Sequence, residues 1–100
     1  KWVDYMVKNK IPFRVSSALR FGGSTGAGPH GYGCAVDFGN LYQVTNGATS
    51  PKASLKGRKT EIYKQIATAG AKFNWYNPKR MADNVGSCDE IWHFEYWGPA

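Results

Sequence analysis

The stretch Gly28-Pro-His-Gly-Tyr-Gly-Cys-Ala-Val-Asp37 predicts a glycine-rich loop that leads into a β-strand. Residues 34–38 are short, apolar and partly β-branched, which is typical of a strand. Because strand side chains alternate between the two faces of a sheet, Ala35 and Asp37 share one face. His30 lies in the loop just before this strand, and we expect it to fold back over that face.

A second stretch, Glu90-Ile-Trp-His93, leads into an aromatic run that ends at residue 96. Residues 91–96 predict a strand with His93 on one face and Trp92 and Phe94 on the other. Glu90 then lies at the mouth of the strand, where a bend can direct its carboxylate towards a metal-bound water.

The two stretches contain both histidines of the chain, His30 and His93, together with Asp37 and Glu90. Two histidines and an aspartate form a common three-ligand zinc site that leaves a fourth position open for water. The remaining glutamate is placed to accept the proton of that water and to transfer it. Two alternatives stay open: His93 is a core histidine without a metal, or Asp89 takes the role of Glu90.

The spacing resembles that of peptidase family M15, whose motif is Ser-x-His-x-x-Gly-x-Ala-x-Asp followed by Glu-x-x-His. This family includes VanY- and VanX-like D,D-peptidases and phage L-alanyl-D-glutamate endolysins. Gly28 stands where the family has serine, which is not a metal ligand there. The matching residues are His30, Gly33, Ala35, Asp37, Glu90 and His93.

The resemblance implies an α+β fold of the kind shared by hedgehog domains and D,D-peptidases, with the zinc site in a cleft. It implies that His30, Asp37 and His93 bind Zn²⁺ and that Glu90 is catalytic. It also implies that Arg20 contacts the substrate carbonyl or carboxylate and stabilises developing negative charge. The alternative for Arg20 is a surface arginine paired with a carboxylate.

The same resemblance implies that the substrate is a peptidoglycan stem peptide. We expect an endopeptidase that resembles the endolysins, and D-alanyl-D-alanine carboxypeptidase activity is the alternative. A non-catalytic zinc-containing module that binds the cell wall is an alternative of another class. We expect the protein to be in the cell envelope or secreted, or to be a phage lysin that acts on the cell wall.

Composition limits the possible partners of the chain. One hundred residues, 42% of them hydrophobic, predict a single domain over residues 1–100, which we expect to be a monomer. No apolar run reaches the roughly 20 residues that cross a bilayer. The net charge of +6 suits an anionic partner such as an acidic cell wall. The basic residues are scattered along the chain, which is typical of a solvated surface and argues against nucleic-acid binding.

The two cysteines, Cys34 and Cys88, lie beside the two halves of the predicted metal site. They do not form a Cys-x-x-Cys pair, so a thiolate zinc site is not expected. A disulfide between them suits an oxidising compartment, and two buried thiols are the alternative.

The rest of the chain predicts a small antiparallel sheet with helices packed on one face, an α+β fold. We expect Gly70 to end the main helix, Tyr42 to pack or to contact substrate, and Glu95 to be an outer partner of His93 or a surface ion pair. The predicted elements are a helix over 1–10, a strand over 13–17, a loop over 21–33, a long polar connection over 38–57, the main helix over 58–69, an extended segment over 72–76 and a turn at 77–78.

Overall fold

The computed structural model of the chain describes residues 1–20, 34–78 and 90–98, with the side chains of residues 19 and 20 excluded. None of the described helices is long and apolar enough to cross a bilayer. In chain order the elements are α1 (Trp2–Lys8), β1 (Val15–Arg20), β2 (Cys34–Phe38), α2 (Gly39–Thr45), α3 (Pro51–Arg58), α4 (Glu61–Ala71), β3 (Trp75–Tyr76) and β4 (His93–Tyr96).

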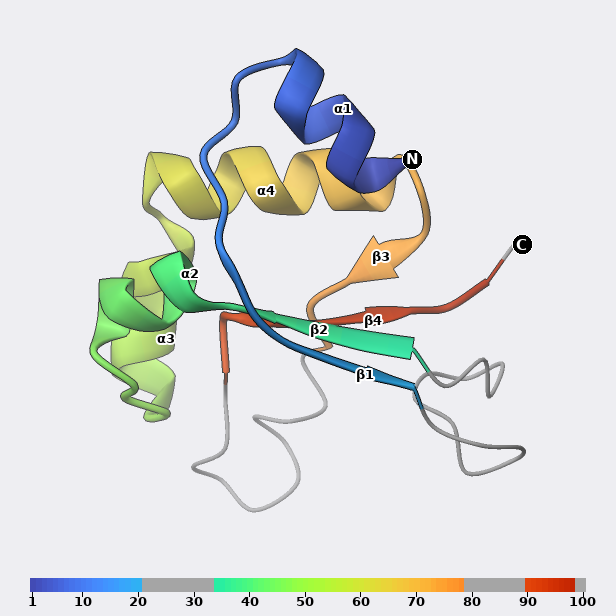
Figure 1. The fold of residues 1–100 in the computed structure, drawn as a ribbon. Helices are drawn as coiled ribbons and strands as arrows, with labels where there is room; N and C mark the ends of the chain where they lie inside the picture. The colour runs from blue at the N-terminus through green and yellow to red at the C-terminus, as the bar shows by residue number, and fades with distance from the viewer. Residues whose placement is uncertain (21–33, 79–89, 99–100) are drawn as a thin grey trace.

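The described strands form one antiparallel sheet in the order β1-β2-β4-β3. Helices α1 and α4 cover one face of this sheet, and α2 and α3 lie at one end of it (Figure 1). The predicted α+β class with a small antiparallel sheet is therefore confirmed, and so is the strand over residues 34–38.

The core lies between the sheet and the helices on its covered face. Phe38 and Phe94 are 1% and 0% exposed, and their rings meet edge to face at 5.6 Å between centroids. Trp2 of α1 packs against both rings. Because side chains alternate along a strand, the residues next to these phenylalanines, including Asp37 and His93, lie on the opposite face.

The polar connection predicted over residues 38–57 was wrong, because this segment contains α2 and α3. The start of α3 carries a signal that the loop interpretation missed. Ser50 caps the helix through a bond from Ala53 N to Ser50 Oγ of 3.2 Å, and Pro51 occupies the first turn. At the end of α2, Asn46 takes the left-handed conformation at φ 54°.

The main helix also differs from its predicted range. It begins at Glu61 because Thr60 is the N-cap and its side chain accepts from Tyr63 N. It continues through Gly70, which is buried rather than a stop signal. A Cβ at position 70 would lie 2.9 Å from Trp2 Cζ2 and 3.0 Å from Trp75 O. The glycine is therefore needed for the close packing of α4 against α1 and β3.

The remaining strand ranges shift by a few residues. Strand β1 covers 15–20 rather than 13–17, and β4 begins at His93 rather than at residue 91. Only Trp75 and Tyr76 of the extended segment pair with β4. The predicted helix over 1–10 is confirmed as α1, which ends two residues early.

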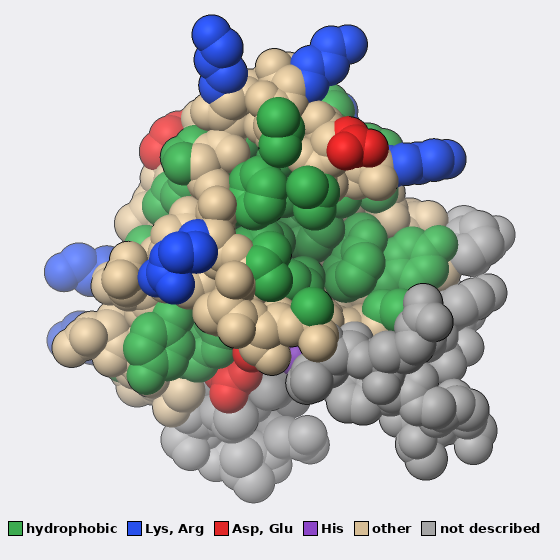
Figure 2. Space-filling model, in the orientation of Figure 1, with side chains coloured by type: hydrophobic (Ala, Val, Ile, Leu, Met, Phe, Trp, Pro, Cys, Tyr) green, Lys and Arg blue, Asp and Glu red, His purple; other side chains and the backbone are tan. Residues whose placement is uncertain are grey.

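An apolar groove of about 470 Å³ opens beside α1 on the covered side of the sheet. Figure 2 shows hydrophobic side chains gathered on this side of the molecule, with Lys and Arg side chains around them. Trp2, Val36, Phe38 and Trp75 contribute to its lining, and the residues that line it do not include Asp37 or His93. The groove is therefore separate from the polar residues on the other face.

Candidate functional site

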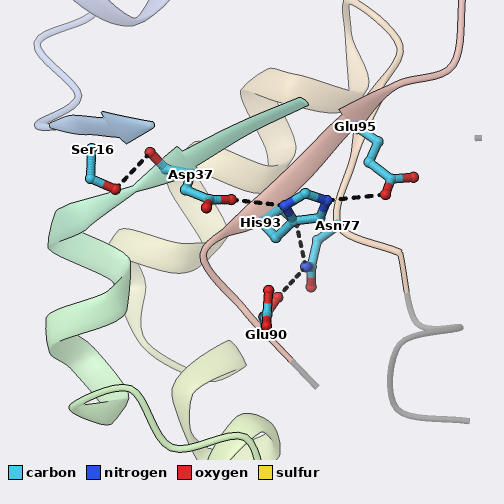
Figure 3. Close-up of polar contacts among 6 residues, drawn as sticks. All are labelled: Ser16, Asp37, Asn77, Glu90, His93 and Glu95. Atoms are coloured by element: carbon cyan, nitrogen blue, oxygen red, sulfur yellow. Dashed lines mark hydrogen bonds and ion pairs between the residues drawn. The ribbon is translucent and has the colours of Figure 1, made fainter. Parts of the chain in front are cut away.

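Asp37 and His93 come together because their strands are neighbours in the sheet. Strand β2 pairs with β4 so that Asp37 lies directly opposite His93. The two side chains therefore share the face away from α1 and α4, and 2.8 Å separates Asp37 Oδ1 from His93 Nδ1. Figure 3 shows both side chains directed towards one another. The two residues are 56 positions apart in the chain, so only the pairing of strands in the sheet brings them together.

The second ring nitrogen of His93 contacts another carboxylate. His93 Nε2 lies 3.0 Å from Glu95 Oε2, two residues further along β4 (Figure 3). Glu95 is 4% exposed, and the side chain of His93 is 14% exposed. The expected contact between Glu95 and His93 is confirmed, and the low exposure of Glu95 excludes an open surface ion pair.

The protonation of His93 reflects these two contacts. Burial alone would lower its pKa, but hydrogen bonds to Glu95 and Asp37, with the charges of both carboxylates, raise the pKa above its ordinary value of 6.5. A neutral imidazole has only one N–H, so it cannot donate to both acids, whereas the protonated ring can.

The glutamate of the Glu-x-x-His stretch precedes β4 in a turn. His93 N lies 3.5 Å from Glu90 O across this turn. Its two middle residues, Ile91 and Trp92, are 0% and 7% exposed and anchor it in the core. Phe38 N also donates to Trp92 O at 3.0 Å, which ties the turn to the end of β2. The main-chain contact across this turn therefore keeps Glu90 close to His93.

Several predicted residues lie outside the part of the chain that the structure describes. These are His30, Gly33, Cys88 and Asp89, so the third zinc ligand and the Cys34–Cys88 disulfide stay predictions. Arg20 is the last residue of β1, and its main chain pairs with Cys34. Its side chain is outside the described part, so its catalytic role also stays a prediction.

The donors that are described suit a zinc ion. An imidazole nitrogen and a carboxylate oxygen are ordinary zinc ligands, and metal-bound histidines commonly donate their other N–H to a carboxylate. When His93 Nε2 donates to Glu95, Nδ1 carries the lone pair of the neutral ring and faces Asp37. Within residues 1–20, 34–78 and 90–98, no three His, Cys, Asp or Glu side chains are grouped to hold a metal. A complete site therefore needs a donor from elsewhere in the chain.

The sequence did not point to two further residues, Ser16 and Asn77, whose side chains make polar contacts near the pair. Ser16 Oγ donates to Asp37 O at 3.2 Å across β1 and β2. The side-chain nitrogen of Asn77 donates hydrogen bonds to the carbonyls of Glu90 and His93, although the sequence predicted Asn77 only as part of a turn. Pro78, which follows Asn77, is the local signal that strand pairing stops here, because proline has no N–H to donate. Tyr42, considered as a substrate contact, packs edge to face against Trp92 at 4.8 Å.

Comparison with known proteins adds no family assignment. No model of a protein family, no curated protein and no solved structure matches the chain. The arrangement of Asp37, His93, Glu95 and Glu90 is therefore the basis on which a function can be proposed.

Proposed function

We propose that this domain is a zinc-dependent peptidase that hydrolyses amide bonds in peptidoglycan stem peptides, as an endopeptidase. The observation that carries the proposal is the 2.8 Å approach of Asp37 Oδ1 to His93 Nδ1 on one sheet face, with His93 Nε2 held by the buried Glu95. The motif spacing adds His30 as the third ligand. The basic net charge of +6 suits an acidic wall as the partner.

A bound zinc ion would supply a water with a pKa of about 7 and a Lewis acid for the substrate carbonyl. The protein side chains do the rest. Glu90 accepts a proton from the attacking water and returns it to the leaving amine. Arg20 stabilises the negative charge that develops on the carbonyl oxygen. Glu95 accepts from His93 Nε2, so Nδ1 can serve as the ligand once the ring gives up the proton that it shares with Asp37.

The test is incubation of the zinc-loaded protein with purified peptidoglycan, followed by mass analysis of the released fragments. New amino-terminal D-glutamate is the expected product and indicates the endopeptidase. Release of free D-alanine would instead indicate a carboxypeptidase. Zinc binding without any release would favour a wall-binding module and overturn the proposal.

The Glu90→Gln variant separates catalysis from metal binding. We expect it to keep zinc and to lose cleavage, because glutamine cannot accept the proton of the water. Glu61→Gln is the matched control, since Glu61 is exposed at the start of α4. Cleavage by Glu90→Gln at the wild-type rate would contradict the role of Glu90.

A further inference from the structure

We infer that Asn77 is a positioning residue for the turn that carries Glu90 and His93. The inference rests on the proposed function, because it assigns this turn to the proposed site. Asn77 Nδ2 donates to Glu90 O at 2.7 Å and to His93 O at 2.8 Å (Figure 3). One amide group therefore holds both ends of the Glu-x-x-His turn.

The orientation of this amide is determined by its other contacts. Asn77 Oδ1 accepts from Arg58 Nε at 3.1 Å, from Arg58 Nη2 at 2.8 Å and from Tyr63 OH at 3.0 Å. A flipped amide would place its NH₂ group against these donors and its oxygen against two carbonyls. The group therefore has one favourable orientation, which links α3 and α4 to the turn.

Main-chain pairing between β3 and β4 ends before Asn77, so a side chain takes over the hydrogen bonding at this position. Tyr76 is the last residue of β3 and pairs with Glu95. Pro78 has no N–H, and a residue before proline is held in an extended conformation. The side chain of Asn77 donates to the carbonyl of His93 where the ladder would otherwise stop.

The turn depends on this bridge more than on its own closing bond. The distance from His93 N to Glu90 O is 3.5 Å, at the weak end of hydrogen bonding. Ile91 and Trp92 anchor the middle of the turn in the core, whereas Asn77 holds its ends. A change at Asn77 should therefore alter the relative placement of Glu90 and His93 while the core stays packed.

Asn77→Asp is the test variant, because it keeps the shape but places a carboxylate oxygen against two carbonyl oxygens. We expect zinc affinity, measured by competition with a chelator, to fall roughly 10- to 100-fold, as for loss of an outer partner of a metal site. At saturating zinc we expect kcat for wall hydrolysis to fall about 100-fold with little change in KM, because a small misplacement acts on the transition state. In the metal-free protein at a fixed pH, the ¹⁵N signals of the His93 imidazole should shift.

The matched control is Asn40→Asp. Asn40 Oδ1 accepts from Arg14 N at 3.1 Å and Asn40 Nδ2 donates to Pro12 O at 3.2 Å, so it also bridges backbone groups but not those of the turn. It should leave zinc affinity and the His93 signals unchanged. If Asn77→Asp does not fold, Arg58→Lys keeps the charge, loses the two-nitrogen contact to Asn77, and should shift the same measurements less.

The outcomes separate the two proposals. A folded Asn77→Asp variant with wild-type His93 signals and wild-type zinc affinity would overturn the positioning role. The positioning role is equally overturned if only Arg58→Lys folds and it behaves as wild type. If the wild-type protein binds no zinc, the proposed function fails, and the His93 signals alone then decide the role of Asn77.

Discussion

Asp37 and His93 occupy paired positions on neighbouring antiparallel strands, with 2.8 Å between Oδ1 and Nδ1. Side chains directly opposite one another on the same face lie within roughly 5 Å at Cβ, so the contact follows from the register of β2 against β4. A slip of one residue would move His93 to the core face and Phe94 to the polar face. The burial of Phe94 therefore also maintains the site.

The first prediction concerns the zinc affinity of the pair. Glu95→Gln should weaken zinc binding roughly 10- to 100-fold, because the neutral amide holds the His93 ring less strongly and lowers its basicity. Asp37→Ala should weaken it more, since a proposed ligand is lost. Chelator competition at constant pH measures both, with Glu61→Gln as the control. Equal zinc affinity in Asp37→Ala and wild type would exclude Asp37 as a ligand.

The second prediction concerns the pH dependence of stability in the metal-free protein. The raised pKa of His93 means that the folded state holds its proton more strongly than the unfolded chain does. This stabilisation is fully present below the unfolded value of about 6.5 and is lost as the pH rises through the folded-state pKa.

Denaturant unfolding with a chelator present, between roughly pH 5.5 and pH 9, measures the effect. The wild-type protein should lose more stability over this range than His93→Gln, which cannot titrate at this position. The comparison removes contributions from other groups. Parallel pH profiles for the two proteins would mean that the pKa of His93 is not raised.

The third prediction concerns the anchor of the Glu90–His93 turn. Ile91→Ala should lower the free energy of unfolding by about 2–5 kcal/mol, because Ile91 is fully buried and its loss leaves a cavity. Leu55→Ala is the control, since Leu55 is 59% exposed and should change stability by no more than roughly 0.5 kcal/mol. Chemical denaturation measures both, and similar effects of the two substitutions would contradict the burial of the turn.

The fourth prediction concerns Arg20. Arg20→Ala should lower kcat for wall hydrolysis roughly 100- to 1,000-fold while zinc affinity stays unchanged, as for loss of a group that stabilises an oxyanion. Arg14→Ala is the control, because Arg14 is exposed and its guanidinium lies against Gly39. An unchanged kcat in Arg20→Ala would leave Arg20 with a surface role only.

Local pattern was sufficient for part of the fold. The apolar run at residues 34–38 identified β2, and the spacing of apolar residues near the start of the chain identified α1. The segment over 39–58 was missed because its helices are short and polar, and α3 has only two buried residues, Ser54 and Gly57. Periodicity is weak in such helices, whereas the Ser50-Pro51 cap signal was present in the sequence.

The candidate site, like the fold, was predictable from the sequence only in part. The sequence by itself determined which residue types were present and which face of each strand they share, because alternation is a local property. It therefore placed Asp37 on the same face of its strand as Ala35, and His93 on the same face of its strand as Glu95, before any pairing was known.

Only the tertiary structure decided that the Asp37 face of β2 and the His93 face of β4 form the same face of the sheet. Strand order and register join residues that lie 56 positions apart, and no local pattern specifies them. The contact of Asn77 with Glu90 and His93 arises likewise, because a side chain that bridges two backbone carbonyls across a fold leaves no periodic trace in the sequence.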